Sequence, residues 1–219
     1  EVDEACRELG VAVVGGHTEF SDRYRDPVLC GTLLGPAERV LSAQAIRPGD
    51  VVVVTKHVGI EGMTILAADR PDLLGPVLGE ESLREVSPWS SSVSVVPEAR
   101  ILRPWCRFMH DPTEGGFMGG MDELCRLASL GVRLDMGRIP LHPATRKAAW
   151  ALGFDPLRLI SSGVLLAVIP PEHVERALGA LGASGIPAAA VGTMDEGGPR
   201  DFGMREELWR LLALPAPGR

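Results

Sequence analysis

Short strand patterns alternate with amphipathic helical patterns along most of this chain, and the alternation restricts the folds that the chain can adopt. Residues 50–59, DVVVVTKHVG, are typical of a buried strand because four consecutive valines leave no polar face. Strands are also predicted at 11–16, 27–35, 132–136, 165–170 and 188–194, and helices at 2–9, 115–131, 143–153, 170–185 and 204–214. Because strands and helices interleave without a strict β-α-β order, the sequence predicts an α+β, or mixed α/β, fold.

The chain starts inside a predicted helix–strand unit. Residues 2–9 have the apolar spacing of one helix face, and residues 11–16, VAVVGG, follow at once as a short strand. A natural domain rarely begins within such a unit. We therefore expect an N-terminally truncated chain whose first segment needs partners to close a core.

Composition and charge narrow the class of protein. The chain has 219 residues, of which 45% are apolar and 23% charged, and its formal net charge is −7. This mix is typical of a folded globular protein, and the acidic balance disfavours a nucleic-acid partner or an anionic membrane surface. No run of about 18 apolar residues occurs, so we expect a cytoplasmic protein without membrane contact.

The four cysteines are scattered without a C-x-x-C pair. This spacing disfavours a zinc site and a disulfide framework, so we expect ordinary reduced thiols, most of them buried. The four residues are Cys6, Cys30, Cys106 and Cys125.

The stretch MHDPTEGG, residues 109–116, precedes a helical pattern and allows two interpretations. Asp111 or Thr113 could cap the helix by accepting hydrogen bonds from its first N–H groups. Without a cap, the helix start is an anion site, and Gly115 and Gly116 would let a phosphate approach the backbone. Asp111 and Glu114 would repel that phosphate unless Mg²⁺ lay between them, because Mg²⁺ binds both carboxylate and phosphate oxygens. The residues by themselves leave the two interpretations about level.

Two more glycine-containing stretches follow predicted strands. GGHTEF, residues 15–20, could offer His17 and Thr18 to a phosphate, or it could be a plain exit turn. TKHVGIEG, residues 55–62, could hold an anion with Lys56 and His57, or it could be a polar loop between domains. It lacks the residue order of a Walker A motif.

Residues 161–163, SSG, are interpreted as a tight turn before a buried strand. No G-x-S-x-G elbow occurs, which disfavours a serine hydrolase.

Four stretches, taken in order, resemble one superfamily of ATP-dependent enzymes. It includes aminoimidazole ribonucleotide (AIR) synthetase, selenophosphate synthetase, thiamine-monophosphate kinase and the hydrogenase maturation factor HypE. The stretches that carry the resemblance are GVAVVGGHTE (10–19), IRPGDVVVVTKHVGIEG (46–62), MHDPTEGG (109–116), and LISSGVLLAVIP (159–170) with AAAVGTM (188–194). MHDPTEGG looks most like the HypE branch, and GGHT is also similar to selenophosphate synthetase.

The resemblance implies a PurM-like two-domain fold. Residues 1–47 would be a remnant of the ATP-binding N-terminal domain, and residues 48–219 would be a complete C-terminal α+β domain. ATP would lie between the domains with Mg²⁺ as its metal ion. By resemblance to the family, the residues expected to bind the nucleotide are Gly15, Gly16, His17, Thr18, Lys56, Thr113, Gly115 and Gly116. The residues that the resemblance implies to be catalytic are His110, Asp111 and Glu114. Asp111 is also the expected Mg²⁺ ligand.

The implied function is ATP-dependent activation of an amide or acyl oxygen by phosphoryl transfer, in hydrogenase maturation. A homodimer and a maturation-partner protein are the implied partners. The sequence departs from the family where Ser162 stands in place of a frequent glutamate of HypE relatives. The family's first metal-binding aspartates and the C-terminal cysteine of HypE are also missing, since the chain ends LALPAPGR. We therefore expect weak or no catalysis by these 219 residues alone. The alternatives are a non-catalytic scaffold, and a phosphotransferase like selenophosphate synthetase or thiamine-monophosphate kinase.

Overall fold

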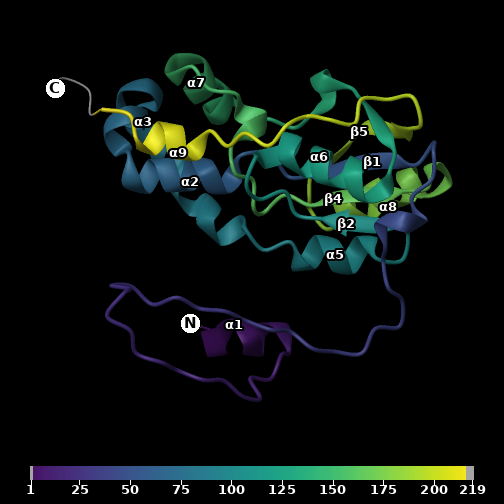
Figure 1. Ribbon diagram of the computed structural model, residues 1–219. Coiled ribbons are helices and arrows are strands. Elements are labelled where there is room, and N and C mark those ends of the chain that lie inside the picture. Colours follow the sequence, from purple (N-terminus) through teal and green to yellow (C-terminus); the bar gives the residue numbers. More distant parts are fainter. Residues whose placement is uncertain (1, 216–219) are drawn as a thin grey trace. The chain divides into compact units, whose positions relative to one another are not determined.

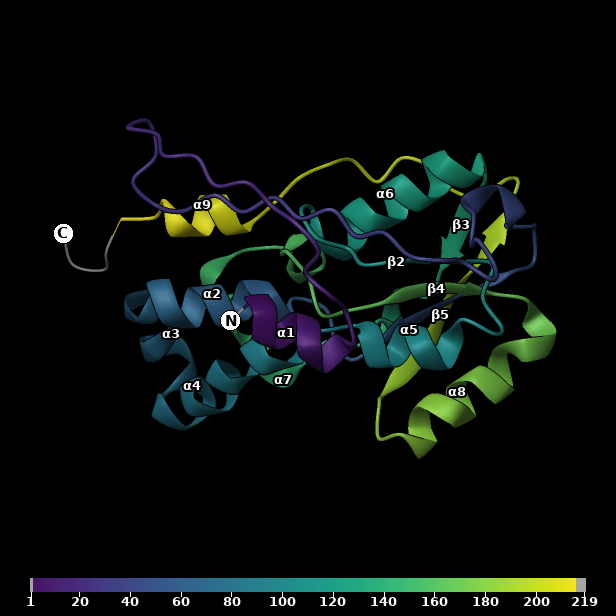
Figure 2. The same ribbon diagram turned by 90° about the horizontal axis from the view of Figure 1, so that it is seen from below.

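The computed structural model describes residues 2–215 (Figures 1 and 2). The chain divides into two compact units between Glu38 and Arg39. Our assignment of residues 1–47 and 48–219 to two family domains stays a prediction. Within residues 2–215, no helix combines the length and the apolar composition needed to cross a bilayer.

The first unit contains helix α1, Val2–Leu9, which confirms the predicted helix. Residues 10–38 form no helix or strand, so the strands predicted at 11–16 and 27–35 are wrong for this structure. A strand needs neighbours for its N–H and C=O groups, and the described residues supply none to these segments. Their apolar side chains remain exposed, as Val14 at 93% and Leu34 at 88% illustrate.

The second unit is built on a five-stranded sheet with the order β2-β4-β1-β5-β3, in which all neighbouring strands are antiparallel. The strands are β1 (Val51–Thr55), β2 (Phe108–His110), β3 (Gly131–Leu134), β4 (Leu166–Ile169) and β5 (Ala188–Asp195). Four of them were predicted, whereas β2 was not. The mixed α/β fold is confirmed.

Helices cover both faces of this sheet, as Figures 1 and 2 show. Alternate side chains of a strand point to opposite faces, so Val52 and Val54 of β1 pack with α6 (Gly116–Ala128). Val53 packs on the other face with α5 (Val96–Leu102) and α8 (Val174–Ala183). This two-sided burial explains why β1 is an unbroken run of valines.

A helical layer with its own core lies beside the sheet (Figure 1). Its helices are α2 (Ile60–Asp69), α3 (Pro71–Leu78), α4 (Glu80–Val86), α7 (Pro143–Leu152) and α9 (Leu208–Leu212). The Arg70 guanidinium donates to the carbonyl oxygens of Leu211, Leu212 and Leu214 at 2.9–3.0 Å and so fixes the end of α9. The short 3-10 helices are η1 (Ala43–Ala45), η2 (Ser87–Ser92), η3 (Met136–Arg138), η4 (Pro156–Arg158) and η5 (Pro171–His173).

Candidate functional site: three turns at one end of the sheet

The antiparallel register brings three motif turns to the same end of the sheet. Leu166, which opens β4, pairs with Val54 near the end of β1 and with His110 at the end of β2. The turns next to these positions are residues 55–62, 110–116 and 159–163, named here the TKHVGIEG turn, the HDPTEGG turn and the LISSG loop. Three of the stretches noted in the sequence are therefore neighbours in space.

The LISSG loop is fastened to the start of α2. The Ser161 hydroxyl is fully buried and accepts a hydrogen bond from the Gly59 N–H at 2.9 Å. The Gly62 N–H donates to the Ile160 carbonyl at 3.1 Å. A Cβ at Gly62 would lie 2.8 Å from Leu159 Cδ1, so the glycine is required by close packing. The predicted tight turn at 161–163 is confirmed, because the Val164 N–H donates to the Ser161 carbonyl at 3.1 Å.

The same loop packs against the start of α6. Gly115 and Gly116 have φ values of 81° and 60°, which favour glycine. A Cβ at Gly116 would lie 2.6 Å from the Leu159 carbonyl oxygen. The glycine pair therefore allows a close approach of protein backbone.

The N–H groups of this glycine pair are already used within the chain. Gly116 donates to the Thr113 carbonyl at 3.0 Å, and Gly115 donates to Glu206 Oε2 at 2.7 Å. Gly115 is itself the residue that caps α6, and no side chain from within the turn caps the helix. The interpretation in which Asp111 or Thr113 caps the helix with its side chain is therefore wrong.

Side chains of the HDPTEGG turn are nevertheless free to meet a ligand. Asp111, Thr113 and Glu114 are all exposed. His110 points back to α6, where its Nε2 lies 2.7 Å from Glu123 Oε2. Sequence reasoning missed Glu123, although a carboxylate in the middle of the helix that follows His110 is the signal that could have indicated it.

The Lys56 ammonium group is bound by other groups of the protein. Its Nζ donates to the carbonyl oxygens of Ser92 and Ser94 at 2.8 and 2.9 Å and lies 2.7 Å from Glu98 Oε1. These contacts use all three donors of the ammonium group. The Lys56 and Glu98 side chains are only 15% and 3% exposed. A contact between Lys56 and a nucleotide stays a prediction, and it would require this network to open.

His57 lies in an aromatic cluster beside Lys56. Its ring centroid is 4.5 Å from that of Trp89 and 5.1 Å from that of His142. Burial, followed by the charge of His142, lowers the pKa of His57 from 6.5 to about 4. A backbone hydrogen bond opposes this shift, and Lys56 adds to it. His57 is therefore neutral at physiological pH.

This lowered pKa predicts that the chain loses stability in mild acid. The folded state holds His57 neutral, whereas the unfolded state takes up a proton near pH 6.5. The contribution is complete above that pH and is lost as the pH falls from 6.5 to about 4. We expect a loss of roughly 2 kcal/mol, allowing for partial solvent screening. Urea unfolding between pH 4 and 7 measures it. The variant His57→Phe should lose most of this pH dependence, and an unchanged dependence in that variant would contradict the assignment.

The GGHTEF stretch belongs to the first unit. Gly15, Gly16, His17 and Thr18 are all exposed there. Their predicted role at the nucleotide phosphates stays a prediction.

The cysteines are free thiols, as predicted, but only Cys106 and Cys125 are buried, so the expectation that most of them are buried is wrong. Burial raises the pKa of Cys106 to about 12 and that of Cys125 to about 11. Neither is a candidate nucleophile at neutral pH.

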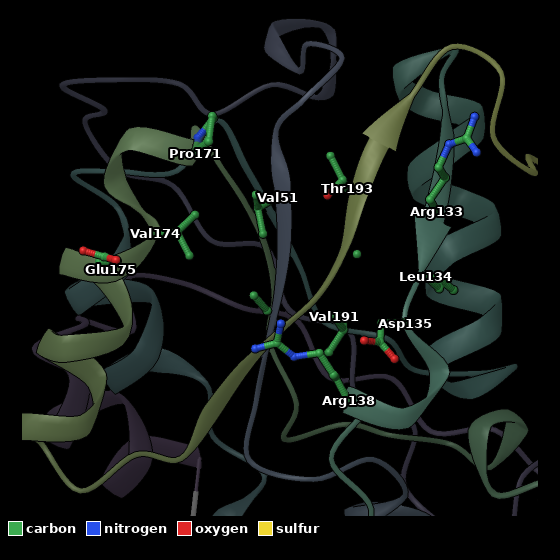
Figure 3. A pocket seen from close by; sticks show the side chains of 12 residues that line it. Val51, Arg133, Leu134, Asp135, Arg138, Pro171, Val174, Glu175, Val191 and Thr193 are labelled. Carbon is green, nitrogen blue, oxygen red and sulfur yellow. The ribbon is translucent and has the colours of Figure 1, made fainter.

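A groove of about 560 Å³ lies at the other end of the sheet (Figure 3). Its lining includes Val51 at the start of β1, Thr193 of β5 and Val174 of α8. Its lining also includes Arg133, Arg138, Asp135 and Glu175, so the charges around the groove balance. The groove is separate from the three turns.

Comparison with known proteins agrees with this fold. Residues 47–202 match the family model described as "AIR synthase related protein, C-terminal domain". The chain belongs to this AIR synthase-related family.

Two curated relatives come from Azotobacter. The hydrogenase expression/formation protein HupE of Azotobacter chroococcum is 34% identical over 87% of this chain and 55% of its own length. The carbamoyl dehydratase HypE of Azotobacter vinelandii is 33% identical over the same shares, 87% and 55%. The chain thus spans about half the length of these relatives.

Solved structures show the same fold. Escherichia coli HypE matches with a TM-score of 0.63 and 24% identity, over 84% of this chain and 55% of that one. HypE in complex with ATP matches with a TM-score of 0.57 and 24% identity, over 78% and 55%. The HypE–HypF complex matches with a TM-score of 0.54 and 17% identity, over 70% and 49%.

Proposed function

We propose that this chain is the C-terminal part of an ATP- and Mg²⁺-dependent enzyme of the AIR synthase/HypE type. Such an enzyme would activate an amide or acyl oxygen by phosphoryl transfer, in hydrogenase maturation. The observation that carries the proposal is the meeting of the TKHVGIEG turn, the HDPTEGG turn and the LISSG loop, with the Asp111 carboxylate exposed among them. The relatives support it, since one is a carbamoyl dehydratase and another was solved with ATP.

The side chains of the HDPTEGG turn fit the chemistry of Mg²⁺. Asp111 and Glu114 offer exposed carboxylate oxygens, which are ligands that this hard cation prefers. Within residues 2–215, however, no group of three His, Cys, Asp or Glu side chains gathers closely enough to hold a metal ion. We propose Asp111 as the ligand from this chain, with phosphate oxygens completing the coordination. Bound Mg²⁺ would neutralise charge on the phosphates.

The other candidate residues differ in whether their hydrogen-bonding groups are free to contact a ligand. The exposed Thr113 hydroxyl can donate to a phosphate oxygen, and Glu114 lies beside it to accept a proton. His110 Nε2 already contacts Glu123, so His110 can contact a ligand only if this interaction is shared with the ligand or broken. Gly115 and Gly116 line the site as backbone, since their N–H groups have protein acceptors.

Catalysis is expected to need more than these residues. A single aspartate is too small a ligand set for a nucleotide-bound metal ion, so we expect weak or no turnover by the 219 residues alone. A homodimer and a maturation partner are proposed as further components. The solved HypE–HypF complex of a relative supports the second of these.

Equilibrium binding of ATP to the full-length gene product, with and without Mg²⁺, tests the proposal. We expect saturable binding that requires Mg²⁺. Absence of any Mg²⁺-dependent binding would refute it.

A non-catalytic scaffold is a second candidate, favoured by a specific observation. Lys56 and the Gly115 N–H, two groups that could hold phosphate, are both engaged by buried or partly buried carboxylates of the chain itself. A scaffold would retain the fold and partner binding but would not respond to substitution of Asp111.

A further inference from the structure

A segment near the end of the chain, residues 199–208, runs along α6 toward the candidate site and is named here the strap. Its Pro199 carbonyl accepts from the Val132 N–H at 2.9 Å. The Phe202 N–H donates to Asp122 Oδ1 of α6 at 3.0 Å. Further along, Met204 lies over the glycines of α6, since a Cβ at Gly119 would be 3.5 Å from its sulfur. The strap therefore follows α6 back to its first turn.

The strap is also fastened to the polypeptide that leads into the LISSG loop. Arg158 donates to the Gly203 carbonyl at 2.9 Å and to the Phe202 carbonyl. The Arg158 carbonyl accepts from the Glu207 N–H at 3.1 Å. These contacts place the Glu206 side chain between the LISSG loop and the HDPTEGG turn.

The Glu206 carboxylate binds three backbone N–H groups, of which two come from other segments and one lies two residues further along the strap. Oε2 accepts from Gly115 at 2.7 Å, and Oε1 accepts from Ile160 at 3.1 Å and from Leu208 at 2.8 Å. Hydrogen bonds to an ionised acceptor are about twice as strong as those between neutral groups. A negative charge is also favoured beside the first N–H groups of α6. One side chain thus joins the HDPTEGG turn, the LISSG loop and the start of α9.

We infer that Glu206 is a positioning residue, which sets the HDPTEGG turn against the LISSG loop and thereby presents Asp111 and Thr113 to the nucleotide. Its effect on the nucleotide rests on the proposed function, whereas its effect on the two segments does not. Because the carboxylate occupies the Gly115 N–H, phosphate recognition falls to the exposed side chains of the turn instead of to its backbone.

The test compares Glu206→Gln with Glu207→Gln in the full-length protein. The first variant has the shape of the native side chain but keeps only one oxygen acceptor. The second is a matched control on the same strap, since Glu207 is buried and pairs with Arg205 at 3.0 Å and Arg210 at 2.7 Å. Glu206→Asp, which keeps the charge on a shorter side chain, serves as a further variant if Glu206→Gln folds poorly.

Amide hydrogen exchange and nucleotide affinity are the two measurements. We expect Glu206→Gln to raise exchange at Gly115 and Ile160 about tenfold, as the loss of a charge-assisted bond implies, and to weaken Mg²⁺–ATP binding by a similar factor. Glu207→Gln should lower the melting temperature without selective exchange at these two amides and without loss of affinity. Unchanged exchange at Gly115 and Ile160 in Glu206→Gln would overturn the inference. Selective exchange with unchanged affinity would overturn the link to the nucleotide.

The two proposals fail separately. If the native protein binds no nucleotide, the proposed function is lost, and exchange at Gly115 and Ile160 alone decides whether Glu206 positions the two segments.

Discussion

Asp111→Asn in the full-length protein is expected to reduce Mg²⁺-dependent ATP turnover by roughly a hundredfold or more, since it removes a charge that would hold the metal ion against the phosphates. Asp111 is exposed and makes no side-chain hydrogen bond or ion pair within residues 2–215, so the free energy of unfolding should change by only about 0.5 kcal/mol. Steady-state kinetics at several Mg²⁺ concentrations measures the effect, which should include a higher Mg²⁺ requirement.

Asp69→Asn provides the matched control for this substitution. Asp69 is an exposed carboxylate at the end of α2, and it makes no ion pair among the described residues. Its substitution should leave turnover and the Mg²⁺ requirement unchanged. Equal turnover of the native protein and Asp111→Asn would contradict the role of Asp111, and absence of turnover in both would favour the scaffold over the enzyme.

Lys56→Met is expected to destabilise the fold by about 3–5 kcal/mol. The substitution removes the ammonium group 2.7 Å from Glu98 Oε1, while Glu98 stays buried at 2% exposure. Glu98 Oε2 has no hydrogen-bond partner of its own, so the carboxylate would be left without any compensating donor. The carbonyl groups of Ser92 and Ser94 would lose their donor as well. Urea denaturation at pH 7 measures the change.

The double variant Lys56→Met with Glu98→Met distinguishes the cost of an unpaired buried charge from the cost of changed side-chain packing. Replacing both partners of a buried pair by apolar residues is often close to neutral, so the double variant should regain most of the lost stability. If the single variant lost less than about 1 kcal/mol, Lys56 would not be the structural residue described above, and its role at the nucleotide would become the better explanation.

The elements that the sequence predicted well are those with a strong local pattern. The valine run of β1, the proline-started helix α7 and the glycine-ended α1 were read from local residues alone. Strand β2 was missed because its three residues, Phe108–His110, are too few to show a period. The strands expected at 11–16 and 27–35 failed for the opposite reason, since their apolar pattern is clear but the described residues give them no neighbour.

The candidate site also combines residues that are local in the sequence with partners that are distant in it. Asp111, Thr113 and Glu114 are exposed and belong to one local turn, so the sequence could name them together, and their role at a metal–nucleotide site stays a proposal. The acceptor of the Gly115 N–H is Glu206, and the partner of Lys56 is Glu98. Both partners lie far away in the sequence, and only the folded chain brings them together. Local residues indicate which groups have the chemistry to bind phosphate, but the fold decides which of them remain available.

The most direct test of a metal–nucleotide site at the HDPTEGG turn replaces Mg²⁺ with paramagnetic Mn²⁺ and records the amide NMR spectrum of the full-length protein with ATP. A paramagnetic ion broadens signals in its immediate surroundings. We predict ATP-dependent broadening of residues 110–116 and of the neighbouring LISSG loop, and its loss in Asp111→Asn. Broadening that avoids both segments, or that persists unchanged in Asp111→Asn, would contradict the account.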